Sequence, residues 1–274
     1  MNPTASPTGR RWERYVAIGD SFTEGMSDRS PDDPEVYVGW ADRLAAYLGA
    51  RNASEDKPFG YANLAIRGRL VGDVTGPQTD AALELSPDLV SVVGGANDAL
   101  RPKVDLDAVA ARLEGAVQRL RASGADVLLA TTADPGWAPV LKHVRPRLAV
   151  HSANVWGIAQ RNGCSVLDVW SMRVLRHPDM WSEDRIHLST VGHERVAAQA
   201  AWTLGLEPGL DWTSPLSPAE PLGRWATAQS HAAWVRTHLS PWVQRRVQGR
   251  SSGDTVQPKR PTVAPLDPAL EETS

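Results

Sequence analysis

A serine with the surroundings of a nucleophile lies near the start of the sequence. Gly19-Asp20-Ser21 follows the apolar run Tyr15–Ile18, a pattern that predicts a short β-strand breaking at the glycine. Such a break would expose the serine hydroxyl at the mouth of a sheet. A serine is a weak nucleophile unless a base takes its proton, and attack on a carbonyl also needs donors for the developing oxyanion. Ser21 therefore requires a base, a carboxylate and amide donors further along the chain.

The segment Asp184-Arg185-Ile186-His187 offers the base and the carboxylate that orients it. With three residues from Asp184 to His187, one turn of backbone can bring the carboxylate to Nδ1–H while Nε2 faces the serine. We interpret His187 as the base and Asp184 as the third member of a Ser-His-Asp triad. His193 is the competing base, but it lies at the start of a helical pattern, where a packing or surface role is more common.

Three amide groups are candidates for the oxyanion hole. They are the backbone N–H groups of Ser21 and Gly68 and the side-chain amide of Asn97. Loss of one such donor typically slows acyl transfer by roughly 10²–10³. Each residue also has a structural alternative: Ser21 as a helix cap, Gly68 as a turn glycine with positive φ, and Asn97 in an Asx-turn.

The elements that must position these groups follow from the hydrophobic pattern. Short apolar runs predict strands at Tyr15–Ile18, Tyr61–Ile66, Leu89–Val93, Val127–Thr131 and Ser165–Val169. Stretches with helical spacing predict helices at Val36–Leu48, Leu70–Leu85, Leu106–Ala122, Val140–Gln160 and Val191–Leu204. Alternating strands and helices predict an α/β fold with a parallel sheet covered on both faces. Because ligands bind beyond the carboxyl ends of such strands, the segments that follow the first three strands are expected to meet at one rim.

Four blocks in chain order resemble the signature of the SGNH, or GDSL, hydrolases. They are Gly19-Asp20-Ser21, Gly68, Gly95-Ala96-Asn97-Asp98 and Asp184-Arg185-Ile186-His187. The resemblance spans roughly residues 14–205 and implies a flavodoxin-like three-layer α/β/α sandwich with a central five-stranded parallel sheet. It also implies that the nucleophile, the two further oxyanion donors and the base are Ser21, Gly68, Asn97 and His187, with Asp184 completing the triad.

An ester hydrolase that forms an acyl-enzyme is the function that these residues predict. The resembling family includes lipases, thioesterases, carbohydrate deacetylases and arylesterases, so the expected substrate is a small-molecule, lipid or carbohydrate ester. An acyltransferase would use the same serine and pass the acyl group to an alcohol. A non-catalytic ligand-binding module is the third alternative, which the presence of all four blocks disfavours.

Composition excludes several other classes of protein. The 274 residues include 29 basic and 32 acidic side chains, and this balance argues against nucleic acid as a partner. No Cys/His cluster has metal-ligand spacing, and the predicted chemistry needs neither metal nor cofactor. Cys164 is the single cysteine, so no intramolecular disulfide can form. No secretory signal or membrane-spanning segment is recognised, which predicts a cytoplasmic protein. The sequence does not predict the oligomeric state.

The chain is predicted to divide into four parts. Residues 1–13 form a flexible N-terminus and residues 14–205 the hydrolase domain. Residues 206–248 combine a Pro-rich linker with a Trp-rich helical extension, and residues 249–274 are predicted to be extended or disordered. The extension is interpreted as a helix packed on the main domain, with a lid over the pocket or a lipid-binding helix as alternatives.

Two further patterns bear on the site. Trp137 and Trp181 fall in loops near the predicted rim and are candidates for lining a substrate pocket. Gly249-Arg250-Ser251-Ser252-Gly253 matches the G-x-S-x-G pattern of α/β-hydrolases. It follows no predicted strand and lies in a polar tail with no histidine after it, so we do not interpret Ser251 as a nucleophile.

Overall fold

A mostly parallel β-sheet forms the centre of the molecule. The computed structural model describes residues 10–30, 33–138, 141–217, 234, 236–237 and 251–266. Within them the sheet has six strands in the order β5-β4-β3-β1-β2-β6. They are β1 (Arg14–Ile18), β2 (Gly60–Asn63), β3 (Leu89–Val92), β4 (Asp126–Ala130), β5 (Ser165–Leu167) and β6 (Arg260–Ala264). β1 to β5 are parallel, and β6 pairs antiparallel with β2.

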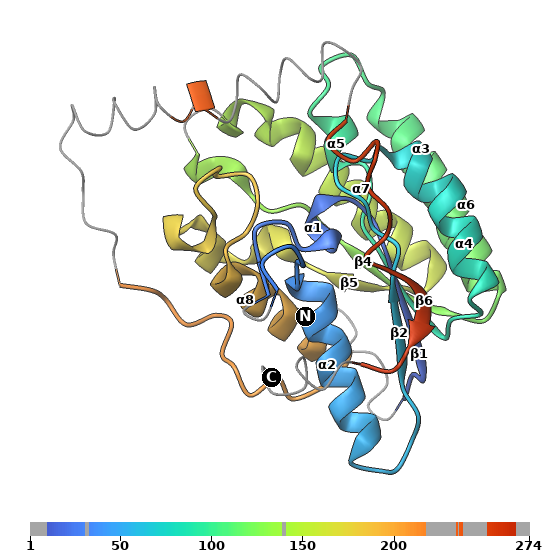
Figure 1. Ribbon diagram of the computed structural model, residues 1–274. Helices are drawn as coiled ribbons and strands as arrows, with labels where there is room; N and C mark the ends of the chain where they lie inside the picture. Colours follow the sequence, from blue (N-terminus) through green and yellow to red (C-terminus); the bar gives the residue numbers. More distant parts are fainter. Residues whose placement is uncertain are drawn as a thin grey trace.

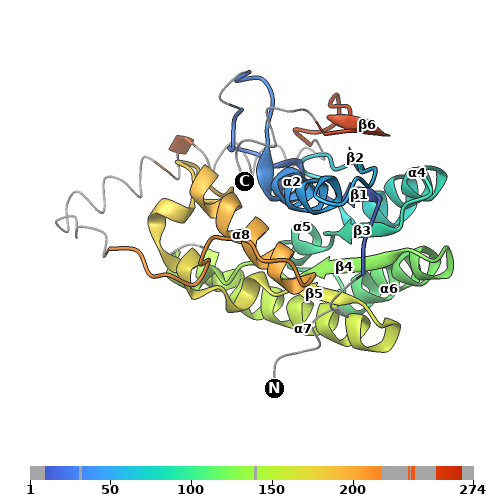
Figure 2. The same cartoon turned by 90° about the horizontal axis from the view of Figure 1, so that it is seen from below.

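Helices cover both faces of the sheet (Figure 1). The α-helices are α1 (Ser21–Glu24), α2 (Gly39–Ala53), α3 (Val71–Asp73), α4 (Thr79–Glu84), α5 (Ala96–Ala99), α6 (Leu106–Ala122), α7 (Arg145–Asn162) and α8 (Thr190–Thr203). α2 packs against α8 on one face, and α6 packs against α7 on the other (Figure 2). The predicted α/β fold class is therefore confirmed.

Strand β1 shows how the sequence builds two cores. Its side chains alternate, so that Tyr15 and Ala17 join the core under α2 and α8, whereas Val16 and Ile18 join the core under α6 and α7. All four are fully buried. A strand that is apolar at every position can be buried on both faces, which is what a central parallel strand requires.

The sheet has one strand more than the five that the sequence predicts. β6 comes from the 249–274 segment, which is predicted to be extended or disordered; Arg260–Ala264 of this segment form an extended strand of the sheet, which the sequence analysis did not expect. β6 is an edge strand with an irregular register, pairing Tyr61 with Ala264 and Asn63 with Arg260. Its sequence includes a proline and alternates weakly, because only one edge of the strand is paired and much of it faces solvent.

Two predicted helices differ in detail. The pattern predicted one helix over Leu70–Leu85, but a π-helical turn at Val74–Gln78 separates α3 from α4. Pro77 lies in this turn and has no N–H to donate, which accounts for the irregular hydrogen bonding. α7 starts at Arg145 instead of Val140, with a proline in its first turn where a missing N–H is tolerated.

Most of the predicted Trp-rich helical extension lies outside the described residues. Trp234 is described, and its side chain is buried. Within the part of the chain that the structure describes, no helix is both long and apolar enough to cross a bilayer.

Two glycines allow the loop after α1 to pass close to the start of α2. Gly25 ends α1 with φ +90° and Gly39 begins α2 with φ +77°, both in the left-handed region. A Cβ on Gly25 would lie 2.6 Å from the Cα of Gly39. Backbone meets backbone here, so neither segment can yield as a flexible side chain would. The end of the helix that carries Ser21 is therefore fixed by this contact.

We expect Gly25→Ala to lower the free energy of unfolding by about 3 kcal/mol, from left-handed strain and overpacking together. Gly124→Ala is the matched control, because Gly124 has φ +93° but a Cβ there would meet nothing within 4 Å. This control should cost only about 1 kcal/mol. Urea denaturation of both variants measures the difference, and equal losses would show that the Gly25–Gly39 approach is not constrained.

Candidate active site

Three segments that follow neighbouring strands meet at the carboxyl edge of the sheet. They follow β1, β2 and β3, which are adjacent in the sheet. Together with the loop before α8 they surround a cavity of about 390 Å³. The predicted site residues that line it are Ser21, Gly68, Asn97, Asp184, His187 and Trp181, and Asp20 lines it as well. The structure thus brings together residues that are up to 167 positions apart in the chain, from Asp20 to His187.

Ser21 is the first residue of α1, but it is not the helix cap. Asp20 is the N-cap, and its Oδ1 accepts a hydrogen bond of 3.1 Å from the Phe22 N–H. A neighbouring side chain therefore fulfils the structural role that would have explained the serine. The Ser21 hydroxyl remains on the cavity wall.

Asp184 and His187 form a tight pair at the other side of the cavity. Asp184 Oδ2 lies 2.6 Å from His187 Nδ1, while Oδ1 accepts the backbone N–H groups of Ile186 and His187 and the hydroxyl of Ser182. Burial alone would raise the pKa of Asp184, but the hydrogen bonds from His187 and the backbone outweigh it and hold the pKa well below its usual range. The carboxylate is therefore ionised, which fixes the proton on Nδ1 and leaves Nε2 as an acceptor.

The nucleophile and base candidates share the cavity without a direct bond. Among the described residues, no hydrogen bond joins Ser21 Oγ to the His187 ring, although both line the cavity. His187 is near enough to the Asp20 carboxylate for its charge to lower the pKa of that group. Contacts of this kind are often long in a free enzyme and shorten when substrate binds.

The side-chain amide of Asn97 joins the three segments of the rim. Its Nδ2 donates to Asp20 Oδ2 and to the Arg69 carbonyl, at 3.1 Å each. These bonds orient the amide between the Ser21 and Gly68 segments. Gly68 has φ +74°, a conformation that favours glycine. An oxyanion in the cavity would take Asn97 Nδ2 by sharing or replacing one of its present acceptors.

Apolar side chains form most of the remaining cavity wall. They include Phe22, Met26, Leu100, Leu141, Leu148 and Trp181. Trp181 faces the cavity, and its Nε1 donates to the Leu175 carbonyl at 2.7 Å. Trp137 packs against Trp181 with 5.5 Å between the ring centroids but does not line the cavity. Only Trp181 of the two predicted tryptophans thus lies in the wall itself.

The remaining buried histidines have other partners. His193 accepts the Trp40 N–H at Nδ1, and its Nε2 lies 3.3 Å from the Met26 carbonyl, so it joins α2, α8 and the loop after α1. Burial lowers its pKa to about 4. His151 lines the cavity beneath Gly95, and burial lowers its pKa to about 4 as well. Both rings stay neutral at ordinary pH, and His193 does not reach the cavity wall.

Several residues at the site escaped the sequence analysis. Glu24 binds the Arg67 guanidinium and accepts the Arg67 backbone N–H, which holds the segment before Gly68. Trp234 Nε1 donates to the Asp184 carbonyl at 2.6 Å. Ser252 lies at the rim of the cavity. The contacts of Glu24 and Trp234 join segments that are distant in the chain, and no local pattern in the sequence signals them. Ser252 belongs to the Gly-x-Ser-x-Gly pattern, but that pattern does not indicate a place beside this cavity.

The chain matches known proteins in sequence and in fold. Residues 17–195 match the model of the GDSL-like lipase/acylhydrolase family. Similar solved structures include TesA, with 23% identity, a TM-score of 0.56 and coverage of 70% of this chain and 98% of that chain. The acetylxylan esterase Axe2 from Geobacillus stearothermophilus has 22% identity, a TM-score of 0.59 and coverage of 77% of this chain and 99% of that chain. LAE5, an alpha/beta hydrolase enzyme from the metagenome of Lake Arreo, Spain, has 24% identity and a TM-score of 0.59. The match covers 74% of this chain and 97% of that chain. The comparison with curated proteins found no match.

The buried carboxyl group of Asp20 makes the free energy of unfolding depend on pH, and comparison with a variant measures this dependence. Burial raises its pKa from 3.8 to about 6, and the Phe22 N–H and the His187 charge offset this only in part, while Asp98 adds to it. A raised folded-state pKa stabilises the fold below the unfolded value and loses that stabilisation as pH rises through the folded value. One pKa unit corresponds to about 1.4 kcal/mol.

We therefore expect the difference in unfolding free energy, Asp20→Asn minus the parent protein, to increase by about 3 kcal/mol as the pH rises from about 4 to about 7. Urea denaturation of both proteins at each pH gives this difference. The contribution of Asp42, whose pKa burial also raises to about 6, is common to both and cancels. A difference that stays constant over this range would contradict the assignment.

Proposed function

This chain belongs to the GDSL-like lipase/acylhydrolase family and is a carboxylic ester hydrolase, and we propose that it works through an acyl-enzyme formed on Ser21. The observation that carries the proposal is the 2.6 Å contact between Asp184 Oδ2 and His187 Nδ1, in the same cavity as the Ser21 hydroxyl. This contact supports the tautomer in which Nε2 can accept a proton.

In the proposed first step, Ser21 Oγ attacks the ester carbonyl carbon while His187 Nε2 takes the hydroxyl proton. The carbonyl π electrons move to the oxygen, which becomes an oxyanion. Asp184 stabilises the imidazolium that forms and stays ionised throughout. The tetrahedral intermediate then collapses, the ester C–O bond breaks, and His187 returns the proton to the leaving alcohol. Ser21 is left as an acyl ester.

The proposed oxyanion hole consists of the Ser21 and Gly68 N–H groups and Asn97 Nδ2. The left-handed backbone of Gly68 and the two hydrogen bonds that orient the Asn97 amide support this assignment. The backbone N–H groups of Ser21 and Gly68 are fixed by the chain before the reaction and need no reorganisation in the transition state. Asn97 Nδ2 would exchange or share one of its two present acceptors to join them.

In the second half of the reaction, His187 takes a proton from water, which attacks the acyl carbonyl. Collapse of this second intermediate releases the carboxylic acid and restores the Ser21 hydroxyl. The apolar side chains around the cavity support an acyl group that is itself apolar. Transfer to an alcohol would use the same acyl-enzyme, and product analysis with an added alcohol measures the share of transfer against hydrolysis.

We expect Ser21→Ala to lose at least roughly 10³-fold in kcat on p-nitrophenyl acetate and butyrate, because no nucleophile remains. A fluorophosphonate probe should modify the parent protein once, and mass spectrometry should locate the adduct on the peptide that contains Ser21. A variant as active as the parent, or an adduct on another serine, would refute the proposed nucleophile.

We expect Asp184→Asn to lower kcat by roughly 10³–10⁴ with little change in KM, since an amide cannot hold the imidazole in the required tautomer. Glu183→Gln is the matched control. It also replaces an acid by its amide in the same loop, but Glu183 is exposed. Steady-state kinetics on the same esters compares the two, and equal effects would contradict the role of Asp184.

A further inference from the structure

The C-terminal strap, defined here as residues 251–266, is attached to the main domain at several points along its length. β6 lies beside β2 at the sheet edge (Figures 1 and 2). A Cβ on Gly60 would lie 2.6 Å from Val263 Cγ1, and a Cβ on Gly49 would lie 2.7 Å from Leu266 Cδ1. Two glycines of the main domain thus leave room for two apolar side chains of the strap.

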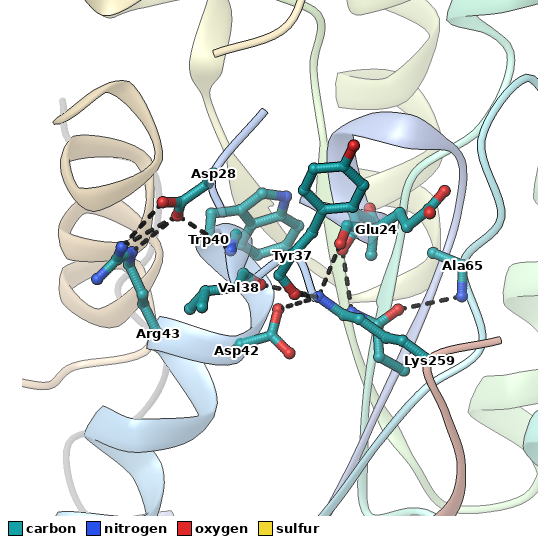
Figure 3. A network of polar contacts seen from close by, with 12 residues as sticks. Glu24, Asp28, Tyr37, Val38, Trp40, Asp42, Arg43, Ala65 and Lys259 are labelled. Atoms are coloured by element: carbon teal, nitrogen blue, oxygen red, sulfur yellow. Dashed lines mark hydrogen bonds and ion pairs between the residues drawn. The ribbon is translucent and has the colours of Figure 1, made fainter. Parts of the chain in front are cut away.

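Lys259 joins the strap to the helix that begins with Ser21. Its Nζ donates to the Glu24, Tyr37 and Val38 carbonyls at 2.7–2.8 Å and lies 2.6 Å from Asp42 Oδ2. Figure 3 shows these groups gathered around the ammonium. Glu24 is the last residue of α1, and Asp42 is buried in the first turn of α2. One cation therefore connects the strap, the nucleophile helix and α2.

The strap then reaches the loop that contains Gly68. Gly253 packs so closely that a Cβ there would lie 2.1 Å from the Arg67 carbonyl oxygen. Ser251 Oγ lies 2.2 Å from the position of a Cβ on Gly68. The Arg69 guanidinium donates to the Gly253 carbonyl at 3.4 Å. Since Glu24 binds Arg67 from the other side, the loop is held between α1 and the strap.

The part of the strap that makes these contacts is itself a turn with internal hydrogen bonds. Asp254 Oδ2 accepts the Ser251 N–H at 2.8 Å, and Ser251 Oγ accepts the Gly253 N–H at 3.1 Å. Ser252 lies between them and lines the cavity at its rim. Ser251 and Gly253 of the Gly-x-Ser-x-Gly sequence that resembles a nucleophile motif thus lie against the candidate oxyanion loop instead.

We propose that the C-terminal strap is part of the active site: Gly253 and Ser251 position the Gly68 oxyanion loop, Lys259 anchors the strap to the nucleophile helix, and Ser252 forms a wall that limits the acyl group. The proposal rests on the proposed function, since it assigns Gly68 to the oxyanion hole. Gly253, Ser251 and Lys259 are positioning residues, and Ser252 determines specificity.

Gly253→Ala tests the positioning role. Gly253 does not have a left-handed φ, so the added methyl acts through its contact with Arg67. We expect kcat on p-nitrophenyl acetate to fall about 10- to 100-fold with KM nearly unchanged, as expected for a displaced oxyanion donor. Fluorophosphonate labelling of Ser21 should slow similarly. Thr255→Ala, an exposed change in the same strap, should match the parent protein in both measurements.

Ser252→Trp tests the wall and does not depend on how Gly253→Ala folds, because Ser252 is exposed. We expect the ratio of kcat/KM for p-nitrophenyl octanoate to that for acetate to fall at least 10-fold, whereas the exposed strap variant Thr255→Ala should keep the parent ratio. Denaturation midpoints identify any variant that fails to fold.

The outcomes separate the two proposals. If Ser21→Ala is inactive while Gly253→Ala labels and turns over like the parent and Ser252→Trp keeps the parent ratio, the strap proposal is wrong and the proposed function stands. If Ser21→Ala is active, the proposed function is wrong. A parallel loss in kcat and a rise in KM for Gly253→Ala, with a lowered denaturation midpoint, would indicate general damage and also overturn the positioning role.

Discussion

One chain of hydrogen bonds holds the candidate active site together: Asp20, the Asn97 amide and the Arg69 carbonyl. Each belongs to the segment that follows a different parallel strand, so one planar amide with two donors connects all three segments of the rim. The same Asp20 carboxylate caps the helix that begins with Ser21. The position of the serine and the orientation of the amide are therefore coupled. A carboxylate whose burial is unfavourable is retained there because it accepts from both partners at once.

Buried charges fix the loop between α1 and α2 in a comparable way. Asp28 binds Arg43 and Asp42 binds Lys259 (Figure 3), and Glu24 binds Arg67. All three carboxylates are nearly inaccessible to solvent. Ion pairs of this kind contribute little net stability, since desolvation offsets most of the attraction. A conformation that separates one of these carboxylates from its paired cation is strongly disfavoured, however, because it leaves an uncompensated buried charge. The pairs thus favour one geometry for the segment that leads from the nucleophile helix to α2.

The sequence was sufficient for the features that repeat along the chain. Continuous apolar runs located β1 to β5, and the amphipathic period located α6 at its observed bounds, Leu106–Ala122. Polar residues after the strands identified the rim, since topology alone brings the ends of adjacent parallel strands together. The strap was not predictable in this way. β6 is stabilised by the edge of β2, and Lys259 by three carbonyls and a carboxylate from distant segments, so neither carries a local pattern. The π-helical turn depends on the single residue Pro77, which a window of helical spacing averages out.

The antiparallel pairing of β6 with β2 has a consequence for the behaviour of the protein in solution. Without its neighbour, β2 would present a row of unpaired N–H and C=O groups that can recruit a strand from another molecule. By occupying that position, the strap replaces the regular edge of β2 with a short, irregular edge strand that contains Pro261 and is a poorer template for intermolecular addition. Proteolytic loss of these few residues would therefore be expected to promote self-association as well as to alter catalysis. Colloidal stability and enzymatic competence would then have a common structural origin.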